Sequence, residues 1–114
     1  MYKEYDELPE DIRKFISCHC LTNGECAKYA PRVVYVKCDD VVFYELNYLQ
    51  YVGYCCKGVC FKSWVYDSDG NQLDWDDEHH RDTIYRAIKK LEEMNAGERI
   101  KSSVIVPHIK PRFF

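Results

Sequence analysis

A run of β-branched and aromatic residues, spanning positions 32–75, constrains the fold of this chain more than any other feature. Residues 32–38 alternate between two faces with the period of two that is typical of a half-buried strand. Asp39-Asp40 then favours a turn, because aspartate side chains hydrogen-bond to nearby backbone groups. Residues 41–49 are therefore predicted to run back antiparallel to the first strand.

The alternation resumes at residues 59–66, which extends the prediction to a local antiparallel meander. Residues 67–71 then predict a hairpin loop, in which Gly70 or Asn71 takes a positive φ. Residues 72–75 are predicted to form a short return strand.

One short helix is predicted before the meander, over residues 8–20. Pro9 suits the first turn of a helix, and the acids that follow it favour the positive N-terminal end. The apolar stripe of this helix consists of Ile12, Phe15 and Ile16, followed by His19 or Cys20.

A longer helix is predicted after the meander, over residues 77–96, with Gly97 ending it. Asp74, Asp76 or Asp77 is expected to cap its start. Its apolar side chains recur at helical spacing: Ile84, Ala87, Ile88, Leu91 and Met94.

This order of elements, completed by a last strand at about residues 99–106, predicts an α+β fold in a single domain over residues 1–114. Its sheet is mostly antiparallel and is covered on one face by the long helix. The short N-terminal helix is a second candidate for covering the sheet.

The composition is that of an ordinary folded protein, with 46% hydrophobic and 31% charged residues. The start of the chain is polar and acidic, and no apolar run approaches the ~20 residues that span a bilayer. We therefore expect a cytoplasmic protein that does not contact the membrane, located in the host cytoplasm if its source is a virus. Residues 1–80 hold 15 acids and 8 bases, whereas residues 81–114 hold 4 acids and 8 bases.

Seven cysteines, an odd number, favour free thiols or metal ligands over a disulfide framework. Two groups of cysteines are candidate zinc ligands: Cys18, Cys20 and Cys26, and Cys55, Cys56 and Cys60. Neither group contains the C-x2-C knuckle in which two thiolates converge from one turn. The prediction is therefore buried thiols and no cofactor, with structural zinc as the alternative.

No motif in the chain selects an enzymatic reaction, and no residue is assigned a catalytic role. Residues 67–78 partly resemble an EF-hand calcium loop, but Gln72 stands where that loop requires glycine. A hairpin loop followed by an acidic helix start explains the same residues. His79 and His80, beside these acids, are the candidates for a small metal- or His-dependent hydrolase.

Ten tyrosines are the excess in this composition. A tyrosine joins a large apolar ring to a hydrogen-bonding hydroxyl, so tyrosines beyond those required by the core suit a contact surface. The predicted interaction patch combines tyrosines with clustered acids: Tyr44, Tyr48, Tyr51, Tyr54, Asp67, Asp69, Asp74, Asp76 and Asp77. Its charge suits a protein partner with a basic surface.

These features favour a small stoichiometric binding protein of the accessory or inhibitor kind. A phage or virus uses such proteins to inhibit or redirect a host macromolecule by protein–protein contact, although no residue pattern selects that source. The alternatives are a zinc-stapled nucleic-acid-binding module and the hydrolase. The net charge of −7 in residues 1–80 disfavours nucleic acid, because it repels phosphate. The sequence does not select an oligomeric state.

Overall fold

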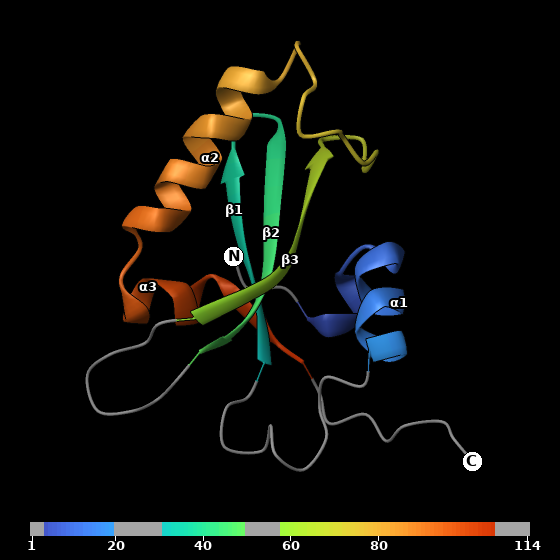
Figure 1. Cartoon of the computed structure of the whole chain (residues 1–114), viewed down its shortest axis with the longest axis vertical. Helices are drawn as coiled ribbons and strands as arrows, with labels where there is room; N and C mark the ends of the chain where they lie inside the picture. The colour runs from blue at the N-terminus through green and yellow to red at the C-terminus, as the bar shows by residue number, and fades with distance from the viewer. Residues whose placement is uncertain (1–3, 20–30, 50–57, 107–114) are drawn as a thin grey trace.

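The computed structural model describes residues 4–19, 31–49 and 58–106 (Figure 1). The elements of these ranges follow in the order η1 (Tyr5–Glu7), α1 (Glu10–His19), β1 (Pro31–Cys38), β2 (Val41–Leu49), β3 (Gly58–Asp67), α2 (Arg81–Glu93), α3 (Ala96–Lys101) and β4 (Ser103–Ile105). The strands form a sheet of order β3-β2-β1-β4, in which each neighbouring pair is antiparallel. The predicted α+β class, with its antiparallel meander, is confirmed.

The first two strands and the turn between them form as predicted. Cys38 pairs with Val41 across the turn, and Asp39 takes a φ of 53°. Aspartate tolerates this left-handed geometry better than most residues. The alternation in β3 is less regular than predicted, because the pairing register with β2 shifts between Leu46 and Asn47.

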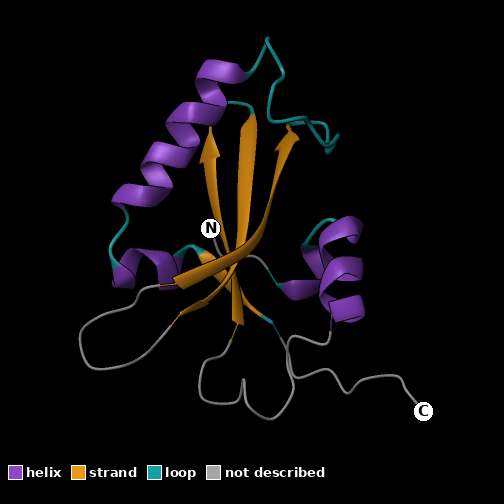
Figure 2. Cartoon of the chain, in the orientation of Figure 1, coloured by secondary structure: helices purple, strands orange, loops and turns teal. Residues whose placement is uncertain are grey.

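The two main helices cover opposite faces of the sheet, as Figures 1 and 2 show. On one face, α2 packs Ile84, Ala87 and Leu91 against the sheet. On the other face, Leu8, Ile12 and Ile16 of the α1 region pack against a second cluster of sheet residues. The described part of the chain therefore has three layers, with a separate apolar interior on each side of the sheet.

Helix α1 has the predicted start and apolar stripe. It begins directly after Pro9, whose carbonyl accepts hydrogen bonds from the backbone of Ile12 and Arg13. Ile12 and Ile16 are fully buried, and the Phe15 ring packs edge-on against Trp64. The burial of this stripe holds the helix on the sheet.

Helix α2 begins at Arg81, four residues later than predicted. The backbone before it forms turns, and the Asp77 carboxylate accepts a hydrogen bond from the His80 backbone, which fixes that turn. Asp74, Asp76 and Asp77 therefore lie in a loop before the helix. The predicted apolar stripe is confirmed, with Ile84, Ala87 and Leu91 buried and with Ile88 and Met94 partly buried.

The prediction that Gly97 ends the long helix is wrong. Helix α2 ends at Glu93, and α3 then begins with Asn95 as its N-cap. The Asn95 side chain accepts from the Glu98 backbone at 2.9 Å, and the Glu98 side chain accepts from the Asn95 backbone at 3.3 Å. This reciprocal capping box starts a new helix and shortens the predicted last strand to Ser103–Ile105.

Residues 72–75 do not form the predicted return strand. The segment makes a single bridge to the sheet, between Gln72 and Tyr66. Gly70, one of the two residues predicted to take a positive φ, has a φ of 85°. No helix in the described ranges is long and apolar enough to cross a membrane.

Candidate functional site

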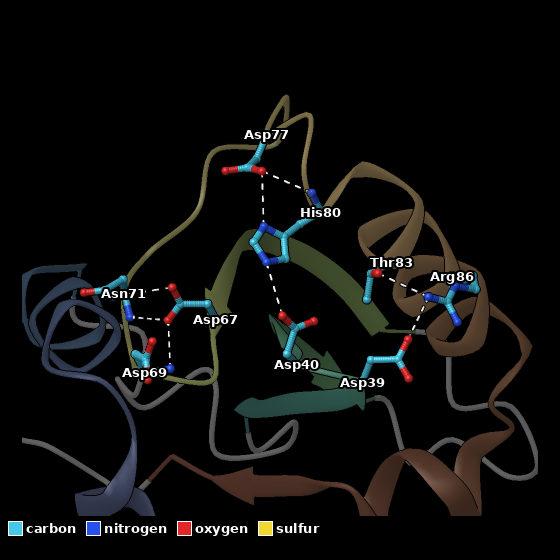
Figure 3. A network of polar contacts seen from close by, with 9 residues as sticks. All are labelled: Asp39, Asp40, Asp67, Asp69, Asn71, Asp77, His80, Thr83 and Arg86. Carbon is cyan, nitrogen blue, oxygen red and sulfur yellow. Dashed lines mark hydrogen bonds and ion pairs between the residues drawn. The ribbon is translucent and has the colours of Figure 1, made fainter.

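Two connections, the β1–β2 turn and the segment from β3 to α2, bring carboxylates together at one end of the sheet (Figure 3). Asp39 and Asp40 form the β1–β2 turn, the loop after β3 begins at Asp67, and residues 74–80 lead into α2. We call the aspartates of these segments the acidic rim: Asp39, Asp40, Asp67, Asp69, Asp74, Asp76 and Asp77. The rim exists because hairpin turns and helix starts, where aspartate is locally favoured, meet at this end.

The loop after β3 is closed by Asp67. Its Oδ1 atom accepts hydrogen bonds from the backbone of Asp69 at 2.9 Å and of Asn71 at 2.8 Å. The hydrogen bond from the Asn71 backbone is the main reason that the pKa of Asp67 lies below its ordinary value. This carboxylate therefore shapes the loop and stays ionised at neutral pH.

His80 joins the loop before α2 to the β1–β2 turn. Its Nδ1 atom lies 3.2 Å from Oδ1 of Asp77, and its Nε2 atom lies 3.3 Å from Oδ2 of Asp40. The hydrogen bond to Asp77, with a smaller contribution from Asp40, raises the pKa of His80, and the same contact lowers the pKa of Asp77. Only the protonated imidazolium can donate from both ring nitrogens, so this arrangement favours a structural role for His80 over proton transfer.

Helix α2 is tied to the same turn by a second charged contact. Nη2 of Arg86 lies 2.7 Å from Oδ2 of Asp39 and donates to Oγ1 of Thr83 at 3.1 Å. The Asp39 and Arg86 side chains are 62% and 58% exposed, so this pair orients the turn more than it stabilises the fold.

The His80 contacts predict a loss of stability as the pH rises. Because the folded-state pKa of His80 is raised, its contribution is fully present below the ordinary pKa of about 6.5 and is lost as the pH passes through the raised value. His80→Gln should therefore abolish part of the decrease in melting temperature between about pH 6 and pH 8. The exposed neighbour serves as the control, since His79→Gln should keep that decrease. Identical pH profiles for the two variants would contradict the contact.

Trp75 stands among the acids of the rim. Its side chain is 48% exposed, and its ring packs edge-on against Phe43 with ring centroids 5.5 Å apart. Asp74 and Asp76 flank it in the sequence and are exposed. The rim therefore includes a large, partly exposed aromatic ring whose position is fixed by its contact with Phe43.

The acids of the predicted patch lie at the end of β3 and in the segment between β3 and α2, whereas one of the predicted tyrosines is buried. Asp69, Asp74 and Asp76 are exposed on the rim, whereas Asp67 and Asp77 are half-buried. Tyr44 is only 3% exposed, so its assignment to an exposed contact surface is wrong. Tyr44 lies on the face of the sheet that α1 covers, and its ring packs in the apolar interior between α1 and the sheet. Only the backbone of Tyr48 is described, in β2, and Tyr51 and Tyr54 lie outside the described residues.

The sequence interpretation left Asp39, Asp40 and Trp75 out of the predicted patch. The sequence predicted the turn at Asp39 and Asp40. The position of this turn beside the segment that leads into α2 depends on the tertiary fold. Trp75 was assigned to a return strand, in which alternate residues face the core.

The predicted zinc ligands fall mostly beyond what the structure describes. Cys20, Cys26, Cys55 and Cys56 lie outside the described residues, and only the backbones of Cys18 and Cys60 are described. Cys38 is a half-buried free thiol at the end of β1. Within the described ranges, no three His, Cys, Asp or Glu side chains are placed to hold a metal ion.

The fold and the site together define a small α+β protein whose sheet ends in a carboxylate-rich rim with an exposed tryptophan. Comparison of the chain with protein-family models, with curated proteins and with solved structures finds no match.

Proposed function

We propose that this protein binds a partner protein stoichiometrically, through the acidic rim and Trp75, and thereby inhibits or redirects that partner. The observation that supports the proposal is an exposed tryptophan that two exposed carboxylates of the rim, Asp74 and Asp76, flank in the sequence. Exposed tryptophans in protein surfaces are frequent anchors of protein–protein contacts. The surrounding acids match a partner with a basic surface.

The charge of the rim sets the kind of partner. Carboxylates concentrated on neighbouring loops attract a basic surface over a distance of about one Debye length, ~8 Å at physiological salt. Such charge complementarity accelerates association and orients the partner. It also repels the phosphates of a nucleic acid.

The rim is held in shape before any partner arrives. Asp67 closes its own loop, His80 joins two loops, and Arg86 ties the β1–β2 turn to α2. A surface that is already ordered loses less conformational entropy when it binds. This supports tight binding by the rim.

The alternatives stay predictions. A zinc-stapled nucleic-acid-binding module draws on cysteines outside the described side chains, and a hydrolase at His80 requires a ring nitrogen available to substrate. Both nitrogens of His80 face carboxylates instead.

The proposal predicts that removing rim charge weakens binding. Asp69→Asn/Asp76→Asn changes two exposed carboxylates and should lower the affinity for the partner about tenfold at low salt. The difference should shrink at high salt, because added ions screen exposed charges. The matched control is Glu92→Gln/Glu93→Gln, which removes the same charge from exposed positions at the far end of α2 and should leave the affinity unchanged.

The measurement has two stages. Immobilised protein captures partners from a lysate of the cells in which it acts, and the captured protein is then purified and titrated calorimetrically. The expected result is a 1:1 complex whose affinity is lowered by the rim variant and not by the control variant. A nucleic acid as the captured species, or a partner whose affinity ignores both salt and the rim variant, would overturn the proposal.

A further inference from the structure

A second feature lies directly below the acidic rim, on the face of the sheet that carries α1. It is an open pocket of about 560 Å³, a size at which pockets bind small molecules or single side chains with their neighbours. Its walls come from β1, β2 and β3, from the loop after β3 and from the segment that leads into α1. We call it the tyrosine pocket, after the residues of its sheet wall: Tyr35, Val42, Tyr44 and Tyr66.

The three tyrosines form a row of rings across three strands. Tyr35 and Tyr44 are direct cross-strand partners, with ring centroids 6.3 Å apart. The Tyr44 and Tyr66 rings meet edge to face at 5.7 Å. Tyr35 is half-buried, whereas Tyr44 and Tyr66 are 3% and 5% exposed, so Tyr35 is the ring of this row that a planar group or a cation can reach.

Tyr66 carries a polar group that the fold leaves unsatisfied. The residue is 5% exposed, and its hydroxyl has no hydrogen-bond partner among the described residues. Burial is the main cause that raises the pKa of Tyr66 to about 12, so the hydroxyl keeps its proton at neutral pH. A buried hydroxyl without a partner is uncommon in a folded protein, and this one belongs to a residue that lines the pocket.

The charged residues of the pocket are mostly acidic. Among the described residues, Glu7, Asp40 and Asp67 line it, against one cation, Lys37. Two of these carboxylates, Asp40 and Asp67, also belong to the acidic rim, so the pocket and the rim share two residues. Within the described residues, no hydrogen bond or ion pair engages the Glu7 carboxylate.

We propose that the tyrosine pocket receives an arginine side chain of the basic partner. The inference rests on the proposed function and names the chemistry that the partner must present beside the rim. A guanidinium group stacks on tyrosine rings and pairs with carboxylates through its fixed fork of donors. The lysine ammonium lacks both the planar face and the fork, so arginine fits this combination of walls better.

The pocket can be tested without the partner. The probe is the blocked peptide acetyl-Gly-Arg-Gly-amide, and its controls carry lysine or citrulline in place of arginine. Citrulline keeps the shape of arginine but has no charge. The arginine peptide should shift the NMR ring signals of Tyr35 and Tyr66 in a saturable way, with a dissociation constant of about 1–10 mM, and each control should bind at least about tenfold more weakly.

Two single-charge variants should change this affinity in opposite directions. Glu7→Gln removes an attractive charge and should weaken the arginine peptide about threefold, whereas Lys37→Gln removes a repulsive charge and should strengthen it about threefold. Glu92→Gln is the control and should have no effect. All three positions are exposed, so the folds should be unchanged, which backbone amide spectra will show.

Tyr66→Phe tests the role of the hydroxyl. The variant removes one oxygen that has no partner in the described residues, so the free protein should be at least as stable as the parent. Binding of the arginine peptide should nevertheless weaken. A drop in stability without a change in peptide affinity would contradict the proposed role.

The outcomes separate this inference from the proposed function. Equal binding of the lysine or citrulline peptide, or signal changes confined to other regions, would overturn the arginine pocket. Partner binding that depends on the rim would still support the proposed function in that case. Conversely, specific arginine binding in the pocket together with a rim that has no influence on the partner would overturn the proposed function.

Discussion

Replacement of Trp75 with alanine is expected to weaken partner binding about 30-fold, the largest effect of any single change on the rim. The ring is 48% exposed and stands between two exposed carboxylates, so a partner that contacts the rim must cover it. A tryptophan that becomes buried on binding contributes a large apolar area, and truncating it also leaves a hole in the interface. Calorimetric titration of the purified partner measures the change.

The controls for this prediction separate binding from folding. Trp75 also packs on Phe43, so alanine at this position should lower stability modestly, whereas Trp75→Phe keeps an aromatic ring there and should recover much of the affinity. Tyr85→Ala removes another exposed ring, 66% exposed on α2, and should leave binding unchanged. Equal losses for Trp75→Ala and Tyr85→Ala would show that the rim is not the contact surface.

Replacement of Ile12 with alanine is expected to lower the free energy of unfolding by about 3 kcal/mol. Ile12 is fully buried between α1 and the sheet, so its truncation removes apolar contacts and leaves a cavity. Urea unfolding at constant pH measures the loss. The exposed neighbour Lys14 provides the control, since Lys14→Ala should change stability by less than about 0.5 kcal/mol.

The same measurement tests the three-layer arrangement. Ile84 is 2% exposed on the opposite face, under α2, and Ile84→Ala should cost a similar amount. The two losses should add in the double variant, because the sheet separates the two interiors. A loss below about 1 kcal/mol for Ile12→Ala would mean that α1 does not pack on the sheet as described.

The elements set by local periodicity were predictable from the sequence. The strands at residues 31–49 and the stripe of α1 depend on side chains that alternate or recur within one element, and these patterns survive in the fold. The antiparallel order also followed from a turn of two aspartates.

Elements whose ends depend on competing local signals, such as helix caps, were not predictable from the sequence. Gly97 predicted a helix end, but Asn95 and Glu98 form a capping box around it, and this local pair of hydrogen bonds determined the outcome. The start of α2 was similarly misplaced, because several aspartates in a row all qualify as caps and the sequence does not rank them.

The site was predictable only in part. Clustered acids at residues 67–77 were visible as a run, but the contributions of Asp39 and Asp40 require the β1–β2 turn to lie beside that loop. The prediction for Tyr44 failed for a different reason, since the sequence does not reveal which face of a sheet the second helix will cover. Tyr44 was thus assigned to solvent when it faces α1.

Because a helix covers each side of the sheet, substitutions on one face can accumulate without disturbing the other face. Neighbouring residues in β1 and β2 send their side chains into separate interiors, so substitutions at Tyr35 or Tyr44 alter the wall of the pocket and leave the anchors of α2 untouched. One half of the molecule is therefore free to diverge towards a new ligand while the other half preserves the scaffold.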